Sequence, residues 1–205
     1  MTKHKGPGRP RHPATAVVHS GRNPAAQHGF VNPPAYRGST VLFPTLEALE
    51  AYERQPFRYG RHGTPTTAAL EDALCELEGG ARTLLTASGY QAVTTAILAF
   101  VKAGDHVLMV DSVYQPTRKF CDTILARLGV ATTYYDPLVG AGIADLIQPN
   151  TRVVFLESPG SLTFEVQDVG AIAKAAQARD VTVLMDNTWA SPLYFRPLAH
   201  GVDVS

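Results

Sequence analysis

The chain has 205 residues, of which 45% are hydrophobic and 18% are charged, and its 18 basic residues balance its 18 acidic residues. Globular domains carry about 25% charged residues, whereas disordered chains carry more charge and fewer apolar residues, so disorder over the whole length is excluded. The balanced charge also argues against a protein that binds nucleic acid through phosphate contacts.

The remaining bulk features predict a cytoplasmic protein. Cys75 and Cys121 form neither a CxxC pair nor a disulfide framework, which favours a reducing compartment. No stretch approaches the roughly 18 apolar residues of a membrane span. The N-terminus lacks the apolar core of a signal peptide. The length suits one large domain, or one domain and an arm.

Composition changes near residue 65, because nine of the fifteen prolines lie at or before Pro65. Residues 1–13 are basic and proline-rich with almost nothing to bury, so we predict a disordered tail. Residues 14–63 are rich in Gly, Pro and aromatic residues, with one short predicted helix over 45–53. We predict that this segment is an extended arm that packs on another part of the protein.

From Thr64 onward the pattern predicts alternating helices and strands. Thr64 can cap a helix with Pro65 at its first position, and Gly79-Gly80 ends that helix. A short strand is predicted over 83–87. The helix that begins at Ser88 is apolar nearly all round, so we predict that it is buried.

The rest of the chain continues the alternation. The predicted elements are a strand over 106–110, a helix over 116–128, strands over 131–135 and 152–156, a helix capped by Asp168 and a strand over 181–185. These strands are short, β-branched and apolar on both faces, which is typical of parallel strands covered by helices. The predicted fold class is therefore α/β with a mostly parallel sheet and helices on both faces.

Ligands of such sheets bind beyond the carboxyl ends of the strands. The residues predicted there are Ser88-Gly89, Asp111, Glu157-Ser158 and Asp186-Asn187, with Tyr114 nearby. The sequence has no HExxH metal pattern and no GxSxG nucleophile elbow. A nucleotide fingerprint is only imitated at 140–145, because Asp145 stands where the third glycine belongs.

Three short segments at or near this edge each allow two interpretations. Ser88–Tyr90 can present free helix N–H groups to a phosphate, or it is an ordinary serine N-cap. Asp186 can serve a cofactor with a protonated ring nitrogen, or it caps a turn. Tyr59–Arg61 can clamp a second side of a phosphate, or it is an exposed turn.

Taken together, the segments resemble the Cys/Met-metabolism family of pyridoxal-phosphate enzymes. The matching segments are TAVVHSG at 15–21, PPAYRGSTVLF at 33–43, YGRHGTPT at 59–66, LTASGYQA at 85–92, GDHVLMVDSVY at 104–114, LESPGS at 156–161 and MDNTWASP at 185–192. They span almost the whole chain after the tail. The resemblance implies the aspartate-aminotransferase fold (fold type I), with an incomplete cofactor-binding α/β domain over 64–205 whose C-terminal part is missing.

Within the family, the form of several segments is similar to the cystathionine β-lyases. The γ-lyases and γ-synthases usually carry an ESPTNP-like segment, and Ser161 stands here in place of its asparagine. The resemblance implies α,β-elimination of cystathionine, which gives homocysteine, pyruvate and ammonia. Another family member, a cystathionine γ-lyase, γ-synthase or methionine γ-lyase, is the alternative.

The resemblance also implies roles for individual residues around pyridoxal 5'-phosphate. Asp186 would pair with the pyridinium nitrogen, so that the ring can accept carbanion electrons. Tyr114 would stack on the ring near the substrate and take part in proton transfer. Gly89 and Tyr90, at the helix start capped by Ser88, would hold the phosphate through their amides.

Two further residues imply an oligomer. In the family, Tyr59 and Arg61 would reach the phosphate bound by the neighbouring subunit. The resemblance therefore implies a homo-oligomer, a dimer of dimers, in which the arm over 14–63 packs on a neighbouring subunit.

The Schiff-base lysine of the family has no counterpart among the five lysines, none of which stands in an S-x-T-K setting. In the family that lysine follows the GVDVS segment, found here at 201–205, by a few residues. We therefore expect an N-terminal fragment with little or no lyase activity. A truncated, non-catalytic binding protein is the alternative of another class, suggested only by the basic GRPR at 8–11.

Overall fold

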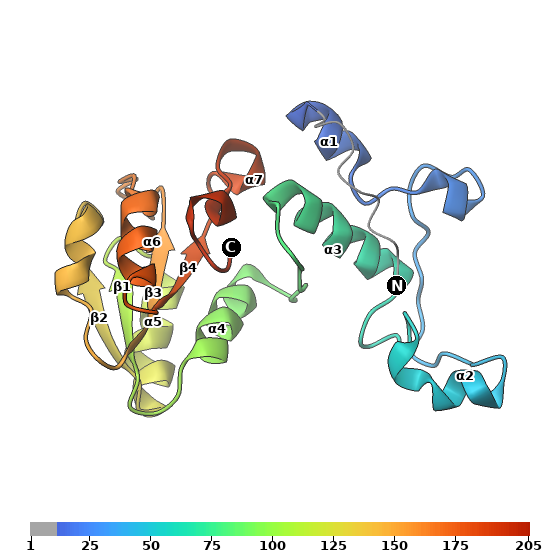
Figure 1. Cartoon of the computed structure of the whole chain (residues 1–205), viewed down its shortest axis with the longest axis horizontal. Coiled ribbons are helices and arrows are strands. Elements are labelled where there is room, and N and C mark those ends of the chain that lie inside the picture. The colour runs from blue at the N-terminus through green and yellow to red at the C-terminus, as the bar shows by residue number, and fades with distance from the viewer. Residues whose placement is uncertain (1–11) are drawn as a thin grey trace. The chain divides into compact units, whose positions relative to one another are not determined.

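A computed structural model describes residues 12–205, and the chain divides into two compact units, Met1–Leu85 and Thr86–Ser205 (Figure 1). Each unit is described by itself. The predicted disordered tail over 1–13 lies outside the described residues except for its last two, and the GRPR segment lies wholly outside them.

The first unit is built from short helices and extended segments. Its described helices are α1 (Pro13–His19), α2 (Leu46–Glu50) and α3 (Pro65–Glu78), with 3-10 turns at Pro24–Gln27 and Tyr52–Arg54. The predicted start of α3 is confirmed, because Thr64 Oγ1 accepts from the Thr67 N–H (3.3 Å) and Thr67 Oγ1 accepts from the Thr64 N–H (2.8 Å). Such a capping box pairs two otherwise free backbone donors.

The chain before α3 is fastened to that helix. Gly21 has φ of 70°, and a Cβ at this position would clash with the carbonyl oxygen of Ala69 on α3. Further along, Thr66 Oγ1 donates to the carbonyl of Pro34 (2.7 Å) and accepts from the Tyr36 N–H (2.8 Å). The extended segment is therefore held by close backbone approach and side-chain hydrogen bonds.

The second unit contains a four-stranded parallel sheet. The strands are β1 (His106–Val110), β2 (Ala131–Tyr135), β3 (Thr151–Glu157) and β4 (Thr182–Asp186), in the order β2-β1-β3-β4. Every pair is parallel, as the apolar strand sequences predict. All five residues of β1 are buried, so this strand forms the centre of the unit.

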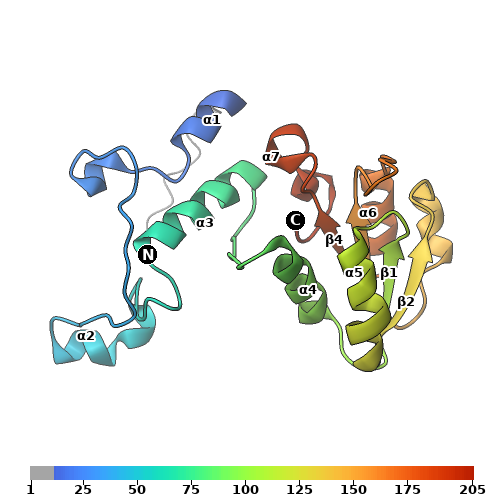
Figure 2. The ribbon, with the colours of Figure 1, turned by 180° about the vertical axis from the view of Figure 1, so that it is seen from behind.

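Helices cover both faces of this sheet. They are α4 (Gly89–Phe100), α5 (Gln115–Phe120) continued by a π-helical turn (Cys121–Leu125), and α6 (Val169–Gln177). The short α7 (Ser191–Tyr194) follows β4, and 3-10 turns lie at Gly140–Asp145 and Pro197–His200. Figure 1 shows α6 in front of the sheet, and Figure 2 shows α4 and α5 on the opposite side. The predicted α/β class with helices on both faces is confirmed.

Two local predictions are wrong. Residues 83–87 form no strand, because no strand is hydrogen-bonded to them, and Leu84 is 72% exposed. Helix α4 is not buried all round: Ile97 is its one buried residue, while Leu98 and Phe100 are 42% and 40% exposed. The apolar sequence predicted the helix correctly, but it overestimated how much of the helix is buried within this unit.

Candidate active site

The carboxyl edge of the sheet gathers acidic residues from neighbouring strands. Glu157 ends β3 and Asp186 ends β4, and the two are direct partners in the parallel register. Asp111 follows β1 immediately, and its carboxylate pairs with Arg118 of α5 (2.5 Å). The topology thus brings together three of the edge positions that the sequence predicts.

Asp186 presents a partly exposed carboxylate at this edge. Its Oδ1 accepts from the Thr188 N–H (3.0 Å), a turn that fixes the side chain at the strand end. Its Oδ2 has no hydrogen-bond partner among residues 12–205. The next residue, Asn187, is buried and donates from Nδ2 to the Phe195 carbonyl (3.0 Å), which ties the following turn to the strand.

The start of α4 offers free backbone donors. Ser88 Oγ accepts from the Gln91 N–H (3.1 Å), so the predicted serine N-cap is confirmed. The amides of Gly89 and Tyr90 have no acceptor within the described part of the chain, and a Cβ on Gly89 would meet open space. Figures 1 and 2 show that α4 runs down to the loop that leads into the start of β1, so the helix start and its free donors lie toward the carboxyl edge.

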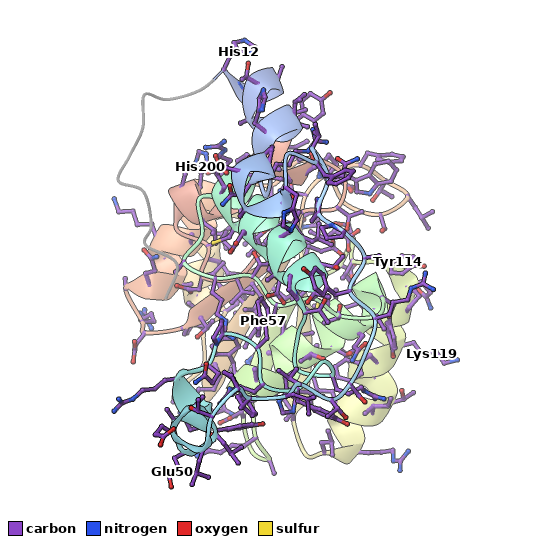
Figure 3. All side chains as sticks on the ribbon, turned by 90° about the vertical axis from the view of Figure 1, so that its right-hand side faces the viewer. His12, Glu50, Phe57, Tyr114, Lys119 and His200 are labelled. Carbon is purple, nitrogen blue, oxygen red and sulfur yellow. The ribbon has the colours of Figure 1, made fainter. Side chains whose placement is uncertain are left out.

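Tyr114 stands where the β1–α5 turn enters its helix. Its backbone N–H donates to Glu157 Oε2 (2.8 Å), and its side chain is 51% exposed. Figure 3 shows Tyr114 and Lys119, both from the α5 region, at the outer edge of the unit. The ring of Tyr114 makes no hydrogen bond or aromatic contact with another described residue.

Glu157 was noted at the edge by the sequence but was not assigned a role. Its carboxylate accepts from the Tyr114 N–H and from Ser161 Oγ–H (2.5 Å), and only 2% of the residue is exposed. Burial raises the pKa of this carboxyl and the nearby Asp186 charge adds to the rise, while the two hydrogen bonds oppose it. The only sequence signal for this residue was an acid at the end of an apolar strand.

Tyr59 and Arg61 belong to the first unit. Tyr59 pairs with Thr40 in an isolated antiparallel bridge and its ring meets His62 edge-on, with centroids 5.4 Å apart. Gly60, which lies between Tyr59 and Arg61 in the sequence, packs so closely on Gly38 that a Cβ would clash with the Gly38 carbonyl oxygen. Both residues therefore sit on a turn with a defined backbone, and both are exposed.

The donor set of the second unit fits pyridoxal phosphate. Two free amides at a helix start suit a phosphate group, and a carboxylate with an unpaired oxygen suits a ring N–H. Among the described residues, no group of three or more His, Cys, Asp and Glu side chains could hold a metal ion. No helix within residues 12–205 is long and apolar enough to cross a membrane.

Comparisons with known proteins agree with this arrangement. Residues 14–205 match the family model of Cys/Met metabolism PLP-dependent enzymes. A putative cystathionine β-lyase of Rhizobium johnstonii is 56% identical over 93% of this chain and 48% of its own length. The cystathionine β-lyase of Escherichia coli is 46% identical over 93% of this chain and 50% of its own length.

Solved structures give the same result. The cystathionine γ-lyase of Lactobacillus plantarum, in complex with L-serine, superimposes with a TM-score of 0.86 at 33% identity, over 95% of this chain and 49% of its own. The chain spans about half the length of the curated relatives it matches. By fold, by edge residues and by sequence over residues 14–205, the chain belongs to the Cys/Met metabolism family of PLP-dependent enzymes.

Proposed function

We propose that this chain carries the cofactor-binding part of a PLP-dependent carbon–sulfur lyase that acts on cystathionine. The observation that carries the proposal is that two kinds of free group lie at the same edge of the sheet: one oxygen of the Asp186 carboxylate, and the backbone amides of Gly89 and Tyr90. The choice of substrate rests on the relatives, several of which are named cystathionine β-lyase.

Bound PLP supplies an electron sink for the carbanion that forms when the substrate loses its α-proton. Asp186 would keep the proton on the pyridinium nitrogen, because a carboxylate at that position favours the cationic ring. Tyr114 would stack on the ring, and its hydroxyl would lie near the substrate to help move a proton. Its exposed position at the edge is consistent with both roles.

The phosphate would lie at the start of α4. The Gly89 and Tyr90 amides would donate to its oxygens, and the missing Cβ of Gly89 leaves room for close approach. Ser88 would contribute by its N-cap, which holds the first turn of α4 in place.

The first unit would complete the site from a neighbouring subunit. Tyr59 and Arg61 would contact the phosphate there, since an exposed guanidinium matches a phosphate bidentately. The arm over 14–63 would then pack on that neighbour in a dimer of dimers. We place the protein in the cytoplasm, where free thiols such as Cys75 and Cys121 stay reduced.

The overall reaction joins cystathionine and water and yields homocysteine, pyruvate and ammonia. To test it, the protein expressed from its whole reading frame is incubated with PLP and cystathionine, and the thiol and keto-acid products are identified. Homocysteine with pyruvate supports the proposal. Cysteine with 2-oxobutyrate would favour the γ-lyase alternative, and no product would contradict lyase activity.

Cofactor binding is tested on the 205-residue chain by the circular dichroism that the protein induces in PLP. We expect saturable binding that Asp186→Asn weakens about tenfold, because the ring loses a charge-assisted partner. Asp180→Asn is the matched control: Asp180 is exposed beyond α6, and its φ of 57° is tolerated by asparagine. Equal affinity of the two variants would contradict the role of Asp186.

A further inference from the structure

Glu157 is the most buried acid at the carboxyl edge, and both of its oxygens are engaged. Oε2 accepts from the backbone N–H of Tyr114 (2.8 Å), and Oε1 accepts from the hydroxyl of Ser161 (2.5 Å). At 2% exposure, this residue offers little surface to a ligand. Burying a carboxylate is costly unless it is hydrogen-bonded, so its two contacts demand a structural explanation.

The two contacts join two separate turns. Tyr114 lies in the β1–α5 turn, and Ser161 lies in the turn that follows β3. A second link runs between the same turns, because the Ser161 N–H donates to the Ser112 carbonyl (2.8 Å). Gly160 packs directly on Ser112, where any Cβ would clash with the serine hydroxyl. The turns are therefore held together by hydrogen bonds and by close packing.

The backbone of Tyr114 is tied to β3 by this link. Its half-exposed ring makes no hydrogen bond or aromatic contact with any other residue in the described range 12–205. The Cα–Cβ bond from which the ring extends is placed by the backbone, which has φ of −51° and ψ of 130° at the start of α5. Its carbonyl accepts from the N–H groups of Thr117 and Arg118 on α5, and the bond from its own N–H to Glu157 ties this backbone to the end of β3.

We propose that Glu157 is a positioning residue, whose carboxylate fixes the backbone of Tyr114 and the Ser161 turn as one unit beside Asp186. This inference rests on the proposed function only in that Tyr114 faces the cofactor ring. Because both of its oxygens are engaged by the protein, Glu157 itself would touch neither ring nor phosphate. Its loss should therefore weaken contacts with the ring and leave the phosphate contacts of α4 unchanged.

The first experiment needs no cofactor. Amide hydrogen exchange at Tyr114 is measured by NMR in the 205-residue chain and in two variants. Glu157→Ala removes the acceptor, so exchange at Tyr114 should rise about tenfold or more relative to β1 amides. Glu157→Gln keeps an acceptor oxygen for Tyr114 and an amide donor for Ser161, so protection should return to within about threefold of the parent.

The second experiment separates ring from phosphate with two probes, pyridoxal 5'-phosphate and inorganic phosphate. Glu157→Ala should weaken PLP about tenfold and leave the affinity for inorganic phosphate unchanged, whereas a general loss of structure would weaken both. Glu157→Gln should retain most of the PLP affinity. Glu165→Gln changes a carboxylate of the same loop whose side chain is hydrogen-bonded to neither Tyr114 nor Ser161, and it should bind both probes like the parent.

The possible outcomes decide between explanations. If Glu157→Gln and Glu157→Ala lose PLP and Tyr114 protection equally, Glu157 acts through its charge and the proposal is wrong. If Glu157→Ala does not fold, Ser161→Ala replaces it: this variant frees one carboxylate oxygen and should weaken PLP about threefold without affecting inorganic phosphate. No loss in Ser161→Ala would overturn the proposal. Failure of the parent chain to bind PLP would refute the proposed function, while Tyr114 exchange would still test Glu157.

Discussion

The two units of this chain differ in how they bury apolar side chains. The second unit has a closed core in which β1, β3 and β4 are covered by helices, and its central residues, such as Leu108 and Val154, are fully buried. In the first unit, Ala16 and Ser20 are the buried residues among those described. Large apolar side chains remain exposed there, with Leu42 at 87% and Phe30 at 72%.

This difference suggests different roles for the two units: the second provides a rigid framework for a site, and the first provides a surface for packing. A parallel sheet buried on both faces holds its carboxyl edge rigidly, which is what a cofactor site requires. The first unit relies on helix caps, close glycine contacts and a few hydrogen bonds, and its apolar surface exceeds what those contacts cover. Such a surface is suited to the proposed packing of the arm on a neighbouring subunit.

The largest expected effect tests whether stability resides in the sheet. Leu108→Ala on β1 should lower the free energy of unfolding by about 3 kcal/mol, because it removes a fully buried side chain and leaves a cavity. Leu42→Ala, at an exposed position of the first unit, should change it by less than about 0.5 kcal/mol. Urea denaturation followed by circular dichroism measures both, and equal losses would show that the first unit has a core of its own.

The two free cysteines provide a chemical comparison, because each unit contains one. Cys121 is 1% exposed, and burial raises the pKa of its thiol to about 11. Cys75 is half-buried, and its Sγ–H donates to the Gly80 carbonyl (3.0 Å). A thiol reagent at pH ~8 should therefore modify Cys75 about 100-fold faster than Cys121, as mass spectrometry of the labelled peptides would show. In urea the two rates should converge, and similar rates in the folded chain would contradict the burial of Cys121.

The sequence predicted the scaffold better than the contacts at the site. The sequence was sufficient where a hydrogen bond joins residues close together in the chain: Thr64 caps α3 and Asp168 caps α6, as predicted. Strands β1, β3 and β4 were found because each is a short, mostly apolar run between turns, and β2 because its threonines and tyrosines favour strands. The expected strand over 83–87 failed because a strand exists only with a partner, and the sequence does not show which strands are paired.

For the site too, the positions of residues could be predicted from the sequence, but their long-range contacts could not. Asp186 and Ser88 could be placed at the carboxyl edge, because strand ends and helix starts can be read from the pattern. The hydrogen bonds of Glu157 could not, since Tyr114 is 43 residues away in the chain and meets it only after β1 and β3 have paired. A long-range contact of this kind has no periodic signal in a single sequence.

A smaller, local effect is expected where the first unit is fastened together. Gly21→Ala forces a Cβ against the Ala69 carbonyl at a φ of 70°, and this should cost more than about 1 kcal/mol by separating α1 from α3. Amide exchange over 13–20 should increase while exchange in β1 stays constant. Gly29→Ala shares the positive φ but meets open space, so it should leave α1 protected. Loss of β1 protection in Gly21→Ala would show that the two units unfold together.

The smallest expected effect concerns pH and the amino edge of the sheet. His106 is 1% exposed, and its ring bridges two hydroxyls, with Nδ1 2.8 Å from Thr151 Oγ1 and Nε2 2.9 Å from Thr133 Oγ1. The ring thus links β1 to both neighbouring strands. Burial lowers the pKa of this histidine, so the folded chain binds the proton less readily than the unfolded chain does.

The sign of the pH effect follows from that difference in proton binding. The contribution of neutral His106 to stability is fully present above the unfolded pKa of about 6.5 and is lost as the pH falls through the lower pKa of the folded state. His106→Gln can bond both threonines but cannot titrate, so its free energy of unfolding should depend less on pH over this range. His19→Gln, at an exposed position on α1, should keep the parent's dependence. An unchanged slope in His106→Gln would mean that other groups destabilise the sheet in acid.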